Sequence, residues 1–159
     1  MIKDKIKTQA DLVDIVKKEK SSGKTIGFTN GCFDILHLGH IRYLADAKKE
    51  CDLLVIGVNS DASVRSIKGT ERPINVQEAR MEVLAALECV DFLTLFEEDT
   101  PEKLIKELTP DILFKGGDWS EEDIVGADHV KSHGGRARVI PYLEGYSTTE
   151  LIKRLREVI

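Results

Sequence analysis

The chain has 159 residues, of which 42% are hydrophobic and 32% are charged, a balance typical of one soluble globular domain spanning residues 1–159. Its net charge of −5 argues against a general nucleic-acid binder, and no apolar stretch is long enough for a membrane span or a signal peptide. The three cysteines, Cys32, Cys51 and Cys89, are widely spaced and form no CxxC pair, which indicates reduced thiols and a cytoplasmic protein.

The pattern of apolar residues predicts helices that alternate with strands. Helical spacing predicts the helices, and continuous apolar runs such as 52–58 are typical of strands buried on both faces of a sheet. In chain order we expect a helix at 8–20, strand 25–29, helix 38–50, strand 52–58, a short helix after Asn59, a loop at 68–73, helix 75–88, strand 90–96, a helix opening at 99–101, strand 112–114, a loop or short helix at 119–135, strand 137–140, and a helix from Ser147 to the end. This alternation predicts an α/β, Rossmann-like domain with a five-stranded, mostly parallel sheet and helices on both faces.

Residues 30–40, which read Asn-Gly-Cys-Phe-Asp-Ile-Leu-His-Leu-Gly-His, form the turn from the first strand into the next helix. Backbone N–H groups at a helix N-terminus lack intrahelical partners and lie at the positive end of the helix dipole, so such a turn binds phosphate. His37 and His40 fall on one face of the first helical turn, where both rings can donate into the same spot. Gly39 is expected where a ligand approaches the backbone closely. A phosphate site is therefore the first hypothesis.

Two other interpretations of the histidine pair stay open. Histidines one helical turn apart can share a zinc ion, although the Glu and the second arm of the HExxH pattern are missing. The pair can also be two ordinary residues on the surface of a helix. The first strand is not followed by GxGxxG, and the Walker pattern is absent as well, which argues against a dinucleotide site and a P-loop.

Further basic residues follow other strand ends, and ligands of open parallel sheets bind at such ends. Lys68 and Arg72 follow the second strand in a polar loop that Pro73 stiffens. They contact phosphate or are solvated surface charges. Lys115 comes directly after a buried strand, where a lysine needs water or an anionic partner.

Glycines, acids and hydroxyls complete the set of candidates. Gly116 and Gly117 allow a sharp turn against a ligand. Asp34 and Asp118 can orient a histidine, hold Mg²⁺, or contact the base or the sugar. Residues 147–150, Ser-Thr-Thr-Glu, form a capping box, and their hydroxyls at a helix N-terminus also make a second anion site. Two such helix ends facing one crevice can span a triphosphate.

Residues 31–40 resemble the HxGH signature of the nucleotidylyltransferase superfamily, and 146–149, Tyr-Ser-Thr-Thr, resemble its second signature. Within the superfamily the chain is similar, over residues 8–159, to the D-glycero-β-D-manno-heptose 1-phosphate adenylyltransferases. The segments that carry this likeness are 68–75, 78–88, 96–101 and 115–118. In many bacteria that activity is the C-terminal domain of a bifunctional protein joined to a sugar kinase, so we expect a stand-alone form.

The resemblance implies a reaction in which ATP and a heptose 1-phosphate give ADP-heptose and pyrophosphate. ADP-heptose is a precursor of the lipopolysaccharide inner core or of other surface glycans. The sugar phosphate oxygen attacks the α-phosphorus in line, so no activated Ser or Cys is needed and catalysis comes from alignment and charge neutralisation.

The resemblance also assigns roles. It implies that His37, His40 and Lys68 are catalytic. The nucleotide-binding residues that it implies are Gly31, Cys32, Phe33, Gly39, Lys115, Gly116, Gly117, Asp118, Tyr146, Ser147, Thr148 and Thr149. Arg72, Arg80 and Asp34 are candidates for the acceptor. Mg²⁺ would bridge the phosphates of ATP without an all-protein cage, and a homodimer is implied.

One residue departs from a close branch of the superfamily. Tyr142 stands where the glycerol-phosphate cytidylyltransferases carry an arginine, which favours a different acceptor or base. Three rival functions stay open. They are a cytidylyltransferase for glycerol 3-phosphate or ethanolamine phosphate, a non-catalytic nucleotide-binding regulator, and a metal-binding protein.

Overall fold

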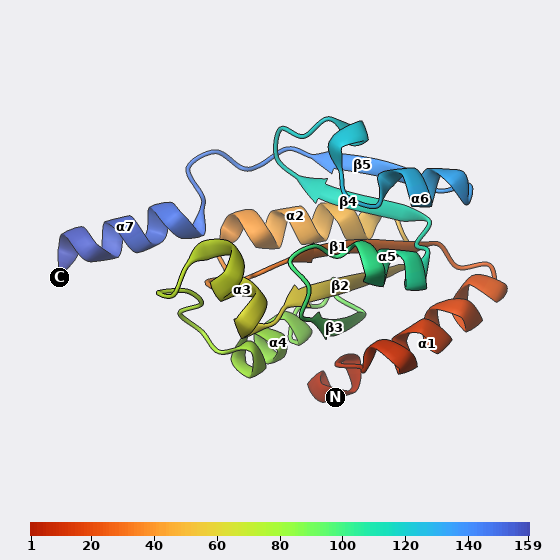
Figure 1. The fold of residues 1–159 in the computed structure, drawn as a ribbon, viewed down its shortest axis with the longest axis horizontal. Coiled ribbons are helices and arrows are strands. Elements are labelled where there is room, and N and C mark those ends of the chain that lie inside the picture. The colour runs from red at the N-terminus through yellow and green to blue at the C-terminus, as the bar shows by residue number, and fades with distance from the viewer.

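A five-stranded sheet lies at the centre of the chain, with strand order β3-β2-β1-β4-β5 and every neighbouring pair parallel (Figure 1). The computed structural model describes residues 1–159. The strands are β1 (Ile26–Gly31), β2 (Leu53–Asn59), β3 (Phe92–Phe96), β4 (Ile112–Gly116) and β5 (Arg136–Ile140). The predicted α/β, Rossmann-like fold is confirmed, with a fully parallel sheet where a mostly parallel one was expected.

Seven α-helices and two short 3-10 turns connect the strands. They are η1 (Ile2–Lys5), α1 (Gln9–Ser21), α2 (Leu38–Lys49), α3 (Asp61–Lys68), α4 (Gln77–Ala85), α5 (Glu102–Leu108), η2 (Glu121–Asp123), α6 (Ala127–Ser132) and α7 (Thr148–Val158). No helix combines the length and the apolar character that crossing a bilayer requires. Most predicted boundaries shift by one or two residues. The larger differences are that α4 is shorter than 75–88 and that Lys68 ends α3 instead of lying in the loop.

The core consists of two clusters, one on each face of the sheet. Helices α1, α5 and α6 cover one face, where Phe28 and Val55 are fully buried. Helices α2 and α4 cover the other face, where Leu44, Ile56 and Phe114 are buried. Successive strand residues point to opposite faces, so these continuous apolar strands supply both clusters at once. The sheet is thereby a rigid platform, and its carboxyl edge points toward the end of the molecule where α7 begins (Figure 1).

Candidate functional site

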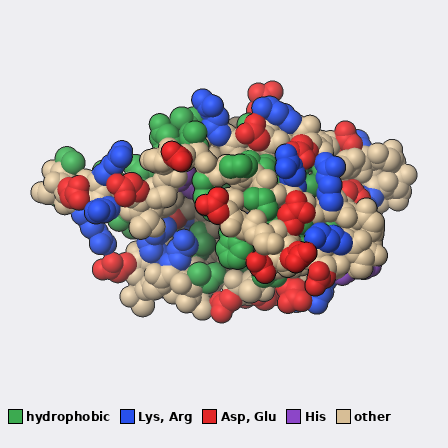
Figure 2. Space-filling view, turned by 90° about the horizontal axis from the view of Figure 1, so that it is seen from above, with side chains coloured by type: hydrophobic (Ala, Val, Ile, Leu, Met, Phe, Trp, Pro, Cys, Tyr) green, Lys and Arg blue, Asp and Glu red, His purple; other side chains and the backbone are tan.

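Two adjoining pockets lie at the carboxyl edge of the sheet. The first, of about 430 Å³, extends from the end of β1 to the loops before α5 and α6. The second, of about 620 Å³, lies between the N-terminus of α2 and the start of α7. Both are lined by His40, Tyr43, Lys68, Tyr142 and Thr148, so they form one cleft. Lys and Arg side chains gather at the α7 end, beside a hollow in the surface (Figure 2).

The two histidines of the β1–α2 turn are stacked on one another. Their ring centroids are 3.9 Å apart, with 27° between the planes. The backbone N–H of His37 donates to Nδ1 of His40 at 3.4 Å. Because His40 Nδ1 accepts this bond, a neutral His40 carries its proton on Nε2 and can donate from that atom.

Gly39 lines the second pocket, and its missing Cβ also leaves room for neighbouring side chains. A Cβ at this position would lie 2.9 Å from ring atoms of His37 and 3.2 Å from Cβ of Tyr146. The glycine therefore lets the His37 ring and the loop before α7 pack closely against the backbone. The close approach of a ligand to this glycine stays a prediction.

Burial keeps both imidazoles neutral near pH 7. It lowers the pKa of His40 to about 4, with smaller contributions from His37 and Lys68. It also lowers the pKa of His37. His37 Nδ1 is the one buried side-chain nitrogen or oxygen atom of the chain that has no hydrogen-bond partner. Such an atom is costly to leave unpaired, so it indicates a place where a bound ligand or water supplies the partner.

The lowered pKa of His40 predicts that the protein loses stability in mild acid. Above pH 6.5 the His40 ring is neutral in both the folded and the unfolded state. Between pH 6.5 and about 4 the unfolded chain binds the proton more readily than the folded protein does. At pH 5 this difference amounts to about 2 kcal/mol. Urea unfolding at pH 7, 6 and 5 should therefore show that the free energy of unfolding falls less with decreasing pH in His40→Asn than in wild type. The exposed His133→Asn is the control, and parallel losses in wild type and His40→Asn would contradict the prediction.

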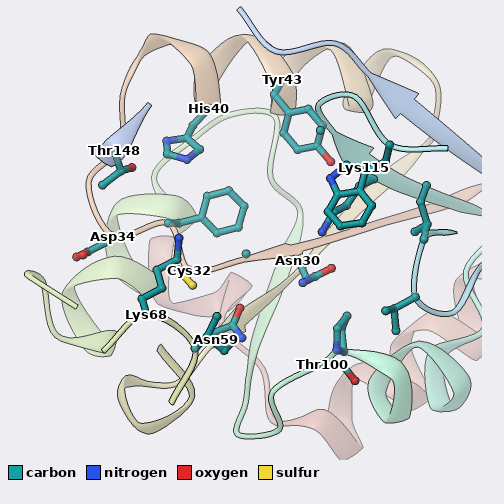
Figure 3. A pocket seen from close by; sticks show the side chains of 18 of the residues that line it. Asn30, Cys32, Asp34, His40, Tyr43, Asn59, Lys68, Thr100, Lys115 and Thr148 are labelled. Carbon is teal, nitrogen blue, oxygen red and sulfur yellow. The ribbon is translucent and has the colours of Figure 1, made fainter. Parts of the chain in front are cut away.

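Lys68 and the start of α7 face His40 across the cleft (Figure 3). Lys68 is exposed, forms no ion pair within the chain, and disfavours a charge on His40. The Thr148 hydroxyl donates to the carbonyl of Ile35 at 3.2 Å, which ties α7 to the β1–α2 turn. Ser147 caps α7 by accepting from the backbone N–H of Glu150 at 3.0 Å, as predicted. Two helix N-termini and one lysine thus surround the same space.

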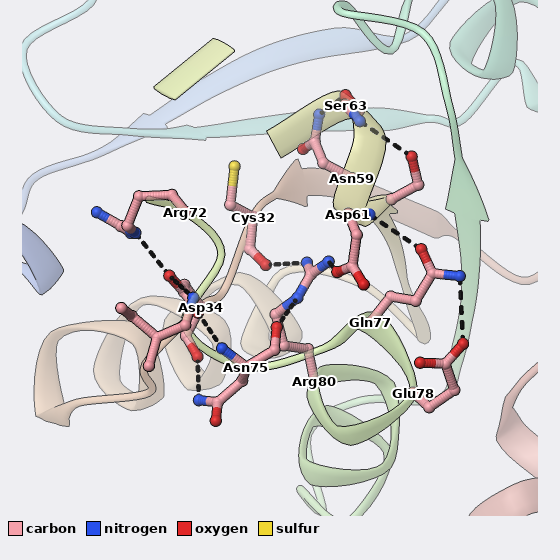
Figure 4. A network of polar contacts seen from close by, with 12 residues as sticks. Cys32, Asp34, Asn59, Asp61, Ser63, Arg72, Asn75, Gln77, Glu78 and Arg80 are labelled. Atoms are coloured by element: carbon pink, nitrogen blue, oxygen red, sulfur yellow. Dashed lines mark hydrogen bonds and ion pairs between the residues drawn. The ribbon is translucent and has the colours of Figure 1, made fainter. Parts of the chain in front are cut away.

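Asp34 is buried and fully engaged by the loop at 69–76 (Figure 4). It accepts from Arg72 Nε at 2.6 Å and from the backbone N–H groups of Ile74 and Asn75. Burial acts to raise the pKa of Asp34, but these backbone and guanidinium donors hold it below its ordinary value. The carboxylate therefore anchors the loop and is not free for a substrate. The terminal nitrogens of Arg72 make no hydrogen bond within the chain, and Arg72 lines the cleft.

Arg80 is buried and serves a structural role, which the sequence around it did not indicate. Its side chain has no exposed surface, and it donates to the carbonyls of Cys32 and Asn75 at 2.5 and 3.0 Å and to Asp61 at 2.9 Å (Figure 4). It lines neither pocket. With its donors used inside the protein, Arg80 braces the β1–α2 turn, and we leave it out of the acceptor candidates.

The remaining predicted residues divide between the pockets and the surrounding structure. Gly31, Cys32, Phe33, Lys115 and Gly116 line the first pocket, and Tyr146, Ser147 and Thr149 line the second. Gly117 and Asp118 line neither. Gly117 has φ 108°, and the Tyr142 ring fills the space that a Cβ there would need. Asp118 is exposed.

Lys115 lies within strand β4 of the sheet. Its ammonium lies 5.1 Å from the centroid of the Trp119 ring, it forms no ion pair, and burial lowers its pKa. A half-buried lysine without a carboxylate partner favours an anionic ligand nearby.

Sequence reasoning missed several residues that line the first pocket. Among them are Asn30, Tyr43, Asn59, Thr100 and Trp119. Asn30 and Asn59 could have been recognised from the sequence, because they are polar residues near the ends of two largely apolar strands. Tyr43, whose hydroxyl pairs with Thr29 at 2.7 Å, lies on a helix and had no such signal.

The histidine pair does not have the surroundings of a zinc site. No three His, Cys, Asp or Glu side chains of the chain gather closely enough to hold a metal ion. The rings stack face to face, and Nδ1 of His40 already accepts a hydrogen bond. A structural zinc takes four ligands, of which this turn offers two at most.

Fold, paired signatures and cleft define a nucleotidyltransferase. The family model described as cytidylyltransferase-like matches residues 28–154, from β1 into α7, and the chain belongs to this family. The enzyme is similar to the bifunctional protein HldE of Geotalea uraniireducens, with 52% identity over 152 residues. HldE of a Marinomonas species is 51% identical over 144 residues. The alignments cover 96% and 91% of this chain but 31% and 30% of those proteins, so the chain spans about a third of their length.

Two solved structures resemble the fold. A lipopolysaccharide core biosynthesis protein from Thermoplasma volcanium is 31% identical, with a TM-score of 0.64, over 79% of this chain and 100% of that one. A pantoate-beta-alanine ligase from Francisella tularensis, crystallised with β,γ-ATP and β-alanine, gives a TM-score of 0.62 over 95% of this chain and 76% of that one. At 15% identity the second likeness concerns the fold alone.

Proposed function

We propose that this nucleotidyltransferase transfers AMP from ATP to D-glycero-β-D-manno-heptose 1-phosphate, giving ADP-heptose and pyrophosphate. The observation that carries the proposal is the cleft, whose two pockets meet at His40, Lys68 and Thr148. The resemblance to heptose 1-phosphate adenylyltransferases and the similarity to HldE over nearly the whole chain support this acceptor. The lipopolysaccharide core biosynthesis protein among its structural neighbours agrees with it.

In-line transfer needs the attacking and leaving oxygens on opposite sides of the α-phosphorus. With that phosphorus beside His40, the second pocket suits the leaving pyrophosphate, because the N-termini of α2 and α7 and the Ser147 and Thr149 hydroxyls lie there. The first pocket then receives the acceptor and also the adenosine, because residues that the resemblance assigns to the nucleotide line it as well, among them Cys32, Phe33 and Lys115. Its phosphate is already an anion, so the reaction needs no side-chain nucleophile.

The side chains serve to stabilise charge that develops during transfer. His40, neutral with its proton on Nε2, donates a hydrogen bond to the transferring phosphate without giving up the proton. Lys68 supplies a mobile positive charge on the same side. The free ends of the Arg72 guanidinium suit the phosphate of the acceptor. Mg²⁺ bound together with ATP would neutralise phosphate charge in this site.

The test is pyrophosphate release with Mg²⁺ and either ATP or CTP. The acceptor panel holds heptose 1-phosphate, glycerol 3-phosphate and phosphoethanolamine, with His37→Ala as the comparison variant. We expect release with ATP and heptose 1-phosphate, and a loss of at least tenfold in the variant, which lacks one phosphate donor. Release only with CTP and a smaller acceptor would keep the mechanism and overturn the substrate. ATP binding without turnover on any acceptor would favour the regulator.

A further inference from the structure

Three adjacent strands carry polar side chains near their carboxyl ends, on a face of the sheet that is otherwise mostly apolar. Phe28 in β1 and Val55 in β2 belong to the cluster under α1, α5 and α6. Because strand residues alternate between faces, Asn30 and Asn59 point to that same face, two and four residues later. Lys115 does so in β4. Strands β2, β1 and β4 are neighbours. Asn30 is level with Gly57 in β2, so Asn59 lies two residues further along that strand, and the three polar groups gather where the hydrophobic core stops.

The amide of Asn59 has a defined orientation. Its Nδ2 donates to Ser63 Oγ at 2.9 Å, and Ser63 Oγ in turn donates to the carbonyl of Glu98 at 2.9 Å. A carbonyl can only accept, so the Ser63 hydroxyl spends its hydrogen there and must accept from Asn59. The Asn59 Oδ1 has no partner in the chain. Asn59 is 3% exposed and lines the first pocket. Its Oδ1 is not among the buried atoms that lack a partner, so this oxygen is accessible from the pocket.

The amide of Asn30 has no hydrogen bond within the chain and lines the same pocket. Asn30, Asn59 and Thr100 lie together on one side of the pocket, away from His40 and Thr148 (Figure 3). The three side chains are uncharged and offer both donors and acceptors. They suit hydroxyl groups, which both donate and accept.

Charged side chains also line this pocket. Asp99 precedes Thr100 in the chain and would repel a phosphate beside it, whereas Lys115 on the strand next to Asn30 would attract an anionic group. Lys68 is close enough to His40 to disfavour its charge, and Arg72 lines the same pocket. An acceptor that carries both a phosphate and hydroxyl groups suits a pocket lined by these cations and amides.

We propose that Asn30 and Asn59, with Thr100, form a subsite that binds the hydroxyl groups of the acceptor's carbon chain. The proposal rests on the proposed function, since in-line transfer assigns the first pocket to the acceptor. Asn59 Oδ1 accepts from a substrate hydroxyl, and the Asn30 amide donates and accepts. These residues thereby select a polyhydroxylated acceptor and take no part in binding ATP.

The test compares Asn30→Leu and Asn59→Leu, which keep side-chain size and remove the amide, with Gln9→Leu. Gln9 donates its amide to the Leu95 carbonyl outside the cleft, so it is a matched control. The measurements are KM for heptose 1-phosphate and calorimetric Kd for a non-hydrolysable ATP analogue with Mg²⁺. We expect each cleft variant to raise the acceptor KM roughly tenfold, with the Kd for the analogue changed less than twofold. Gln9→Leu should change neither.

An unchanged acceptor KM, or a Kd for the ATP analogue weakened as much as that KM, would overturn the subsite. Asn30 has no internal hydrogen bond to lose, so Asn30→Leu decides alone if Asn59→Leu fails to fold. Failure of the proposed function has a different signature. If the wild type uses glycerol 3-phosphate and not the heptose, the acceptor is wrong, but the subsite still predicts a raised KM for glycerol 3-phosphate in both variants.

Discussion

His40→Ala is expected to lower kcat by roughly 10²- to 10³-fold, with ATP still able to bind. The reason is that His40 lies where the two pockets meet, and its Nε2–H is fixed as a donor by the hydrogen bond that Nδ1 accepts. A hydrogen-bond donor that is already in position stabilises the charge of the transition state without any rearrangement of the site. Other phosphate contacts remain in the variant, so the effect on KM for ATP should be much smaller than the effect on kcat.

His40→Gln separates hydrogen bonding from proton transfer. The glutamine Nε2 can occupy nearly the same place as the imidazole Nε2, so it should recover at least tenfold of the activity lost in His40→Ala. Because the pKa of His40 is about 4, the wild-type kcat should also show no step between pH 6 and 7. The exposed His133→Ala is the control. A dead His40→Gln together with a step near pH 6.5 would indicate general acid–base catalysis instead.

The strands and the two signatures were predictable because they rest on local patterns. An apolar run such as 52–58 has few alternatives to a buried strand, and the HxGH turn follows directly from its place between a strand and a helix. The ends of the helices were harder to predict. Val76 and Val83 helped to predict the helix at 75–88, yet both are exposed, since only one side of α4 packs on the sheet.

The roles of individual side chains depend on contacts between distant segments. Nothing near Arg80 in the sequence distinguishes it from Arg72, although the first is buried among carbonyls and the second lines the cleft. Asp34 likewise meets its partners some 40 residues away. The strand-end amides could have been found by asking which face each strand residue points to. A homodimer stays a prediction, which sedimentation would test.

Arg80→Met is expected to lower the free energy of unfolding by about 3 kcal/mol, because each buried acceptor left without a partner costs about 1–3 kcal/mol. Methionine fills much of the same volume but leaves the carbonyls of Cys32 and Asn75 without their donor. Asp61 also loses its partner, although its side chain is 21% exposed and can regain water. The loss should therefore come chiefly from unpaired backbone groups at the β1–α2 turn.

Urea unfolding measures this loss, with Arg136→Met as the matched control. Arg136 is an exposed arginine that pairs with Glu50 at 3.3 Å, and such surface pairs contribute at most about 1 kcal/mol. Arg80→Lys should fall between the two, because one ammonium cannot reach three acceptors in different directions. Since the Cys32 carbonyl belongs to the β1–α2 turn, which lines the cleft, Arg80→Met should also weaken binding of ATP and acceptor together. A variant as stable as wild type that loses only acceptor affinity would instead assign Arg80 to the sugar phosphate.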